Sequence, residues 1–104
     1  MELDPVFKAL ADPTRRALLD LLRDREGQTL FELHTRLSQI DGNTLTRQGL
    51  SRHLAILERA GLIRTNFEWK SKHHYLQSAP LERLTRIWLS RFLTSQQQQE
   101  NTPA

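Results

Sequence analysis

The hydrophobic residues of this chain recur mostly at helical spacing. In the first 60 residues they return every three or four positions in four separate segments, which is the pattern of helices that bury one face. We expect a helix over about 5–11, a second from Pro13 that ends before Gly27, a third that follows Thr29, and a fourth over about 47–60. The inward residues of these helices are predicted to be Val6, Phe7, Leu10, Ala17, Leu18, Leu21, Leu22, Leu30, Leu33, Leu37, Leu50, Leu54 and Leu57.

Polar residues mark the beginnings of these helices. The Asp-Pro pairs at 4–5 and 12–13 each combine a capping side chain with a proline that suits the first helical turn. Thr29 and Glu32 have the spacing of a capping box, and Thr46 is placed to cap the fourth helix. Each helix beginning is therefore predicted from local chemistry.

Glycines and a turn cluster interrupt the helical pattern. Gly49 lies in the first turn of the fourth helix, where it costs up to about 1 kcal/mol of helix propensity relative to alanine. It either permits a close approach of the backbone or is tolerated near the helix end. Gly61 fits the left-handed conformation that ends helices. The segment 38–45 contains Asp-Gly-Asn and is predicted to be a turn.

After the fourth helix the pattern changes to alternation. Apolar and aromatic residues over 62–76 fit a β-hairpin with a turn near 69–72. Pro80 then opens a last helix with an apolar lining. The predicted fold class is mainly α with a small β-hairpin, in the order α-α-α-α-β-β-α, which is a winged helix-turn-helix.

The composition fits one domain over residues 1–95, followed by a disordered polar tail at 96–104. The chain has no cysteine, which excludes disulfides, iron–sulfur clusters and thiolate zinc sites. No segment approaches the roughly 18 consecutive apolar residues of a membrane helix. The acidic, proline-interrupted N-terminus is unlike a signal peptide. We therefore expect a cytoplasmic protein without a membrane partner.

The positive charge is concentrated in one part of the chain. The net charge is +3, and residues 46–80 carry six basic and two acidic side chains, whereas residues 1–45 carry six basic and eight acidic ones. Such asymmetry favours a polyanionic partner, most often nucleic acid. A solvated basic face without a partner is the alternative, because the excess is modest.

The predicted fourth helix has two different faces. Its leucines repeat on one side, while its N-terminal outer side carries amide, hydroxyl and guanidinium groups. Gln48 can bond adenine through two hydrogen bonds, and Arg47 or Arg52 can bind O6 and N7 of guanine. Ser51 can reach a phosphate or a base, and the helix N-terminus itself favours a phosphate. This face suits a DNA major groove.

Other polar residues extend this candidate site. His53 follows Ser51 by two positions, so the two point to different sides of the helix and do not form a nucleophile–base pair. A packed or phosphate-facing histidine is expected. Lys70 and Lys72 lie at the predicted hairpin turn and suit phosphate contact. The predicted DNA-binding residues are Arg47, Gln48, Ser51, Arg52, His53, Lys70 and Lys72.

Three segments together resemble one family. FKALADPTRRALLDLL (7–22), LSRHLAILERAGLIR (50–64) and LQSAPLERL (76–84) are similar in sequence and spacing to ArsR-type (ArsR/SmtB-like) winged-helix transcriptional regulators. The resemblance covers about residues 5–93. It implies a homodimer that binds a palindromic operator and represses transcription.

The resemblance also implies a dimer interface formed by the first and last helices. The last helix has two adjacent apolar sides, more than one small core covers. A single wide core face is the alternative. The predicted interface residues are Val6, Phe7, Leu10, Leu84, Ile87, Trp88, Leu89 and Phe92.

The chain departs from the metal-sensing members of this family. Thr29 and Phe31 occupy the positions of a cysteine pair used by many members, and neither binds a soft metal. Residues 80–104 contain no histidine and no aspartate, the ligands that other members use on the last helix. His34 is expected to be a solvated helix residue. We therefore expect no metal site and no cofactor.

The wing also departs from the family pattern. Trp69 stands where a glycine is common at the wing tip. We expect it to pack against the wing, and contact with DNA sugars is the alternative. His73 and His74 are adjacent on a strand and face opposite sides, so they are expected to have structural or DNA-facing roles and not to chelate one ion. The segment 38–45 is longer than in compact members.

The sequence favours a dimeric DNA-binding autorepressor that does not sense metal. A winged-helix protein-interaction module without sequence-specific readout is the alternative. No phosphate loop, carboxylate pair or ligand cluster indicates an enzyme. A small molecule or a protein as inducer, repression against activation, and the operator sequence all stay open.

Overall fold

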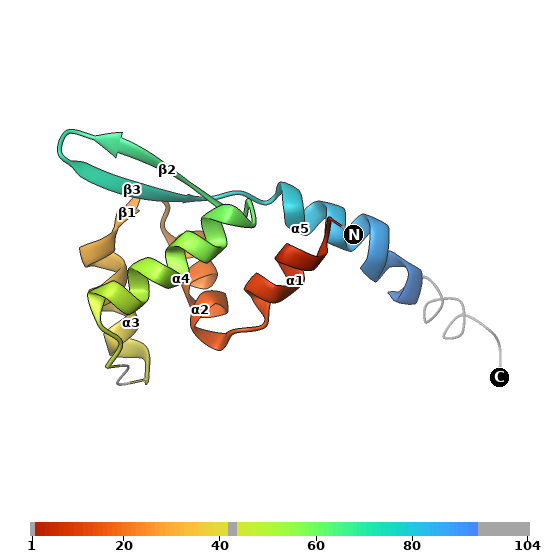
Figure 1. The fold of residues 1–104 in the computed structure, drawn as a ribbon, viewed down its shortest axis with the longest axis horizontal. Helices are drawn as coiled ribbons and strands as arrows, with labels where there is room; N and C mark the ends of the chain where they lie inside the picture. The colour runs from red at the N-terminus through yellow and green to blue at the C-terminus, as the bar shows by residue number, and fades with distance from the viewer. Residues whose placement is uncertain (1, 42–43, 94–104) are drawn as a thin grey trace.

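The computed structural model describes residues 2–41 and 44–93, and their element order is the predicted one with one added strand (Figure 1). The predicted tail at 96–104 and the pair at 42–43 in the predicted turn lie outside the described residues. The elements are α1 (Asp4–Leu10), α2 (Pro13–Asp24), β1 (Gln28–Thr29), α3 (Leu30–Asp41), α4 (Arg47–Arg59), β2 (Ile63–Glu68), β3 (Ser71–Leu76), α5 (Ala79–Leu84) and a π-helical turn η1 (Thr85–Leu89).

Three of the four predicted helix caps are present. The carboxylate of Asp12 accepts from the backbone N–H groups at 14 and 15, and the hydroxyl of Thr46 accepts from the N–H of Gly49. Thr29 and Glu32 form the reciprocal capping box, and the Thr29 N–H lowers the pKa of the Glu32 carboxyl. The prediction for Asp4 was wrong, because that residue is the first of α1 and Leu3 precedes it without a side-chain cap.

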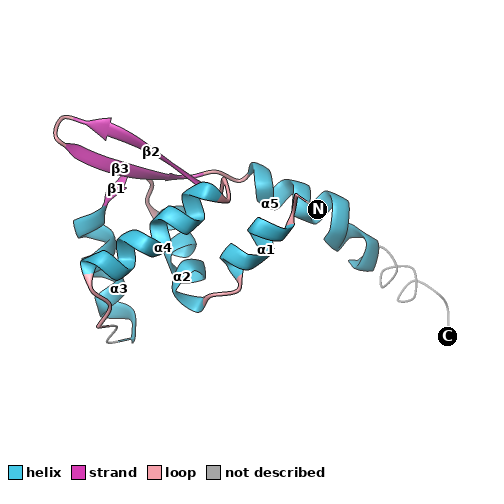
Figure 2. Ribbon diagram, in the orientation of Figure 1, coloured by secondary structure: helices cyan, strands magenta, loops and turns pink. Residues whose placement is uncertain are grey.

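The three strands form one antiparallel sheet in the order β1-β3-β2 (Figure 2). In the hairpin Ile63 pairs with Leu76 and Glu68 pairs with Ser71, so the turn lies at 69–70, as predicted. The sequence analysis missed β1, whose two residues pair with His73 and His74 of β3. Two residues are too few to produce an alternating pattern, and this strand exists only through its partner.

The core lies where the inner faces of the helices meet the base of the hairpin. Leu18 and Leu22 of α2, Leu33 of α3, and Leu50 and Leu57 of α4 are completely buried. These are helix positions that the apolar periodicity predicted. Gly61 follows α4 with a φ of 77°, which confirms the left-handed position expected from the sequence.

Two boundaries differ from the sequence expectation. The predicted turn at 38–45 begins too early, because α3 continues to Asp41. Ser38 is tolerated inside that helix since its hydroxyl donates to the His34 carbonyl at 2.8 Å. The last helix is also not regular, because α5 passes at Thr85 into the π-helical turn η1. No helix of residues 2–41 and 44–93 has the length and hydrophobicity needed to cross a membrane.

Candidate nucleic-acid interface

Helix α4 separates its two roles onto two faces. Leu50, Leu54 and Leu57 are buried, as predicted. Arg47, Gln48, Ser51 and Arg52 are exposed, also as predicted. The first turn of a helix leaves its N–H groups without backbone partners, and here the N–H of Gly49 donates to the Thr46 hydroxyl. The N-terminal half of α4 thus offers donors of several lengths to one partner.

Gly49 gives that first turn the space it needs. A Cβ at this position would lie 2.8 Å from Cδ1 of Leu45, well inside van der Waals contact. The close approach expected from the sequence is therefore real, although the neighbour is the residue that leads into α4 and not another helix. The Leu45 carbonyl in turn accepts from Nε2–H of His34 at 2.7 Å. His34 is not the solvated residue that was predicted, because it fastens α3 to the entry of α4.

Arg47 and His53 have protein contacts that limit their freedom. The Arg47 guanidinium lies 5.7 Å from the ring centre of Phe31, an exposed residue of α3. His53 is half-buried, and its Nδ1 accepts from the Arg15 guanidinium at 3.1 Å. Since arginine only donates, the neutral ring then carries its proton on Nε2. His53 is thus packed, as one of the two expected alternatives, and retains one donor.

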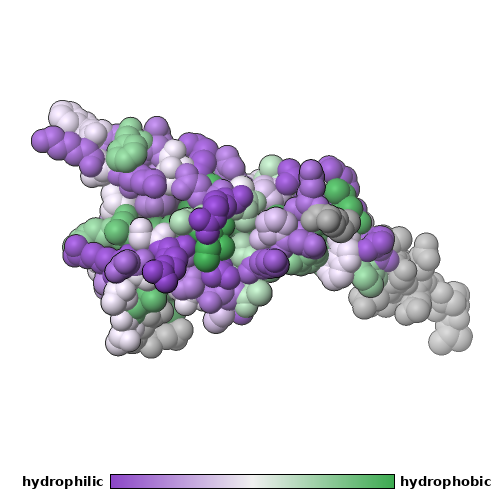
Figure 3. Space-filling view, in the orientation of Figure 1, coloured by the Kyte–Doolittle hydropathy of each residue, from purple (hydrophilic) through white to green (hydrophobic). Residues whose placement is uncertain are grey.

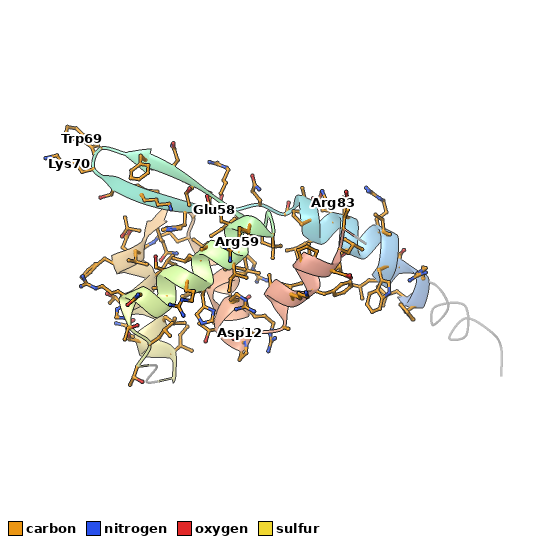
Figure 4. All side chains as sticks on the ribbon, viewed as in Figure 1. Asp12, Glu58, Arg59, Trp69, Lys70 and Arg83 are labelled. Carbon is orange, nitrogen blue, oxygen red and sulfur yellow. The ribbon has the colours of Figure 1, made fainter. Side chains whose placement is uncertain are left out.

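The hairpin extends away from the helices as a wing (Figures 1 and 4). Lys70 and Lys72 are exposed on it. The prediction that Trp69 packs against the wing was wrong, because this side chain is 100% exposed at the tip. Its backbone has a φ of 62°, and the neighbouring residues of the tip are exposed as well.

Polar contacts hold the wing to the body of the domain. The Thr65 hydroxyl donates to Glu58 of α4 at 2.9 Å, which fastens β2 to the C-terminal half of that helix. The Tyr75 hydroxyl donates to Glu68 at 2.7 Å, a bond that raises the pKa of Tyr75. The Arg64 guanidinium lies 4.4 Å from the Tyr75 ring centre. The Thr65 bond thus joins the wing to α4, whereas the two Tyr75 contacts lie between β2 and β3 and hold the hairpin itself together.

The two adjacent histidines have structural contacts on opposite faces of β3. Nδ1–H of His73 donates to the Gly27 carbonyl at 2.7 Å, and Nδ1–H of His74 donates to the Gln28 carbonyl at 2.9 Å. His74 is buried, and its burial lowers the pKa of the imidazole despite the bond to Gln28. This confirms the structural role that was one of the two expected for the pair.

The surface between α4 and the wing is hollowed. One hollow of about 240 Å³ lies between Ser51 and Glu58 of α4 and Lys72 of β3. A second of about 290 Å³ lies between Arg47 and Lys72. We call the surface formed by Arg47, Gln48, Ser51, Arg52, Lys70 and Lys72 the basic face. It combines a protruding helix, a protruding hairpin and a depression with cationic groups between them.

The comparisons with known proteins agree with this geometry. Residues 10–66 match the model of a family described as a helix-turn-helix domain. The HTH-type transcriptional regulator YuzN of Bacillus subtilis (strain 168) is 40% identical over 86 residues, which are 83% of this chain and 94% of YuzN. The chain is a helix-turn-helix transcriptional regulator of the ArsR type.

Solved structures of similar proteins cover almost the whole regulator. The ArsR family transcriptional regulator RHA00566 superimposes with a TM-score of 0.68 at 26% identity, over 99% of this chain and 94% of that one. HlyU from Vibrio cholerae N16961 gives a TM-score of 0.64 at 32% identity, over 85% and 92% of the two chains. The mainly helical fold with a hairpin wing is thus the fold of this family.

The regulator carries a second distinctive surface at its other end. The Trp88 ring packs edge-on against the rings of Phe7 of α1 and of Phe92. The distances between ring centres are 5.1 Å and 4.9 Å, respectively. Ile87 and Phe92 remain 43% and 51% exposed, and Leu93 is 49% exposed. We call the surface formed by Phe7, Ile87, Trp88, Phe92 and Leu93 the aromatic end. Hydrophobic colour is visible both on the wing and at this end (Figure 3).

Two of the predicted interface residues belong to the core of the protomer. Val6 is 1% exposed and Leu84 is 6% exposed, so neither offers much surface to another chain. Periodicity identified both as apolar, but it cannot tell whether the covering partner is the same chain or a second one. Phe7, Leu10, Trp88 and Leu89 are partly exposed and Ile87 and Phe92 are exposed, so these six residues have surface available and their place in an interface stays a prediction.

The positions that bind metals in other family members have different roles in this regulator. Thr29 caps α3, and Phe31 lies beside Arg47. Within the part of the chain that the structure describes, no three side chains of histidine, aspartate or glutamate come together in a way that would hold a metal ion.

Proposed function

We propose that the regulator binds operator DNA as a homodimer and represses transcription, including that of its own operon, without sensing a metal. The observation that carries the DNA-binding site is the basic face. Its α4 side chains are exposed around a helix N-terminus, and the neighbouring wing carries Lys70 and Lys72 on the same side of the fold. Helix α4 would enter the major groove with Arg47, Gln48, Ser51 and Arg52 at base edges.

The hollow between α4 and the wing gives the sugar–phosphate backbone a place in this arrangement. A DNA strand separates the major groove from the next minor groove, so it must pass between a helix in one and a wing in the other. Lys72 lines both hollows and would contact the phosphates of this strand. His53 points to a different side of α4 from Ser51 and packs against Arg15 of α2, so it does not belong to this depression.

The aromatic end supports the dimeric part of the proposal. Exposed apolar side chains next to a partly buried aromatic cluster are typical of a surface that another subunit covers. A two-fold axis near this end would place the two α4 helices on successive major grooves, about 34 Å apart. The mycobacterial protein Mb0332, whose structure is described as a homodimeric winged helix-turn-helix domain, has the same fold.

The absence of metal sensing is supported by the chemistry of two side chains. At the two positions where many family members have a metal-binding cysteine pair, Thr29 caps α3 and Phe31 lies beside Arg47. Neither side chain is a soft metal ligand. Regulation by a small molecule or a partner protein is compatible with this surface chemistry.

The variant Arg52→Ala tests the reading role of α4. Duplexes of 30 base pairs are first selected by the protein from a randomised library, and binding is then measured by fluorescence anisotropy. Arg52→Ala should weaken binding to the selected duplex by about 1–3 kcal/mol and relax preference at one base position. Arg83→Ala removes the same charge from the exposed surface of α5, far from the wing (Figure 4), and should leave both unchanged. An unaltered sequence preference in Arg52→Ala would remove Arg52 from the readout.

A further inference from the structure

The wing tip contains a residue that the fold itself does not favour. Trp69 connects β2 to β3 with a φ of 62°, a conformation that the chain otherwise gives, among its described residues, only to Gly27 and Gly61. A bulky side chain in this region is disfavoured by contact between its Cβ and the backbone. Glycine or asparagine would form the same turn with less strain.

The exposure of Trp69 is equally unfavourable for a protein in water. The side chain is 100% exposed, and on the same hairpin Phe67 is 71% exposed. Both aromatic side chains of the outer half of the wing are therefore exposed, and burial in the protomer does not explain them. Both observations indicate that the cost is offset by a partner of the wing tip.

The charges around Trp69 restrict the chemistry of that partner. Lys70 follows it directly, and Lys72 pairs with Phe67 across the hairpin, so cations flank the aromatic surface. Glu68, the one acidic neighbour, is engaged by the Tyr75 hydroxyl at 2.7 Å. An apolar ring between ammonium groups suits a polyanion that has apolar surface beneath its charges. A DNA minor groove has this character, with phosphates along its edges and sugars and base edges inside.

The position of the tip agrees with this partner. The strands of the hairpin have six residues each, which gives the wing a reach of about 20 Å beyond its base. The N-terminal half of α4 and the wing tip lie toward the same end of the molecule, away from α5 (Figures 1 and 4). With α4 in a major groove, the tip meets the adjacent minor groove across one DNA strand.

We propose that Trp69 is a wedge that enters the minor groove next to the major groove read by α4. Its indole packs against sugars and inserts partly at a base step, while Lys70 and Lys72 contact the phosphates on either side. Such insertion bends the duplex and favours base steps that unstack easily, in particular pyrimidine–purine steps. Trp69 then contributes specificity at positions that α4 does not touch. This inference rests on the proposed DNA-binding function.

Fluorescence of the wild-type protein tests the contact directly. The chain has two tryptophans, and Trp88 lies between Phe7 and Phe92 at the other end of the fold. Titration with the selected 30-base-pair duplex should quench the emission in parallel with the anisotropy change. In Trp69→Phe the quenching should disappear, because the remaining tryptophan is distant from the DNA. Quenching that persists in Trp69→Phe overturns the wedge.

Affinity and DNA bending provide the second readout. Trp69→Asn should bind the selected duplex about 5- to 100-fold more weakly and bend it less, as measured by energy transfer between dyes at the duplex ends. Its thermal stability should be unchanged or higher, because asparagine tolerates the left-handed turn. A loss of binding in this variant is then not a loss of folding. Lys70→Ala is the matched control, which should reduce the salt dependence of binding, whereas Trp69→Asn should leave it unchanged.

The outcomes separate the wedge from the function on which it rests. If the wild type binds the selected duplex and Trp69→Asn binds and bends it equally well, the proposal for Trp69 is wrong, whereas the proposed DNA-binding function is unaffected. If selection enriches no sequence, the sequence-specific function fails. The wedge is then tested on a fixed A·T-rich 30-base-pair duplex, where unchanged emission overturns it too. A blue-shifted emission with phosphatidylglycerol vesicles, and none with DNA, would assign the wing tip to a membrane surface and overturn the proposal.

Discussion

The basic face and the aromatic end, which lie at different ends of the regulator, are formed by different kinds of exposed side chain. At the basic face the exposed groups are guanidinium, ammonium, amide and hydroxyl, and the apolar residues of α4 are buried beneath them. At the aromatic end the exposed groups are Ile87, Phe92 and Leu93, next to a tryptophan that is itself only partly covered. The two surfaces therefore suit different partners. A polyanion matches the basic face, and a second apolar surface matches the aromatic end.

The two ends are also connected. Arg15 of α2 donates through Nε to the Ala9 carbonyl at 2.7 Å and through Nη2 to the Lys8 carbonyl at 3.0 Å, at the end of α1. Its Nη1 contacts His53 of α4 at 3.1 Å. One guanidinium therefore joins the helix of the aromatic end to the helix of the basic face. Substitutions on one surface should therefore act directly only on dimerisation or only on DNA contact, whereas a substitution of Arg15 should affect both helices.

The largest expected effect comes from charging the aromatic end. Ile87→Glu combined with Phe92→Glu should convert the dimer to a monomer, because two carboxylates would have to be desolvated in the interface. DNA affinity should fall by about 100-fold or more, since two linked half-site contacts become one. Light scattering after gel filtration and anisotropy measure the two effects.

Ile40→Glu is the matched control for this variant. Ile40 is 49% exposed on α3, and the same substitution there introduces a charge without touching the aromatic end. It should remain dimeric. A wild-type protein that is already monomeric, or a charged variant that stays dimeric, would break the comparison between the two ends.

The next largest effect is expected at the link. Arg15→Ala should lower the free energy of unfolding by about 2 kcal/mol, because two carbonyls at the end of α1 and Nδ1 of His53 lose a charged donor. Arg15→Lys should recover less than half of this, since an ammonium group cannot span three acceptors in a planar arrangement. Urea denaturation followed by circular dichroism measures both.

The neighbouring arginine controls for loss of a guanidinium at the same helix end. Arg16 is exposed and donates once, to the Leu10 carbonyl at 2.7 Å. Arg16→Ala should therefore cost clearly less than Arg15→Ala. Equal losses in the two variants would mean that Arg15 has no linking role.

A smaller effect is expected from pH at the base of the wing. Burial lowers the pKa of His74 in the folded state, so the unfolded chain takes up this proton first as the pH falls. The contribution of neutral His74 to the free energy of unfolding is fully present above the ordinary histidine pKa of about 6.5. It is lost as the pH falls below that value, at no more than about 1.4 kcal/mol per pH unit. His74→Asn keeps a donor for the Gln28 carbonyl and should flatten this slope.

Urea midpoints between pH 7.5 and pH 5 measure this dependence. His73→Asn removes an imidazole from the neighbouring position of β3, where the side chain is 23% exposed, and serves as the control for a general effect of losing a histidine. The slope should flatten more in His74→Asn than in His73→Asn. Identical slopes in His74→Asn and the wild type would show that the buried ring does not contribute.

Residues whose roles depend on local chemistry could be predicted from the sequence, and residues whose roles depend on distant contacts could not. The cap at Asp12, the capping box at Thr29 and the buried leucines of α4 follow from spacing within one turn or two. The same spacing identified which α4 side chains are exposed. These features need no knowledge of the rest of the chain.

The errors arose where a partner far along the chain decides the outcome. Strand β1 forms only because His74 and His73 lie opposite its two residues, 46 and 44 positions further along the chain. His34 finds its acceptor at Leu45, and Val6 is covered by its own protomer. Trp69 was expected to pack because tryptophan usually does, whereas it is fully exposed at a turn residue with positive φ. The signal that was available is the position itself, since a tryptophan at a turn that favours glycine indicates a role outside the fold.

The smallest expected effect separates charge from readout within the basic face. Lys70→Ala removes one cation from the wing tip, where an ammonium group contacts phosphates without reading a base. Affinity should fall only a few-fold, and the slope of log affinity against log salt should decrease by about 0.9, the value for one released counterion. The preferred sequence and the dimeric state should not change, because neither α4 nor the aromatic end is altered. If Lys70→Ala instead changed the preferred sequence, the wing would read bases through a lysine, and the division between a reading helix and an anchoring wing would have to be abandoned.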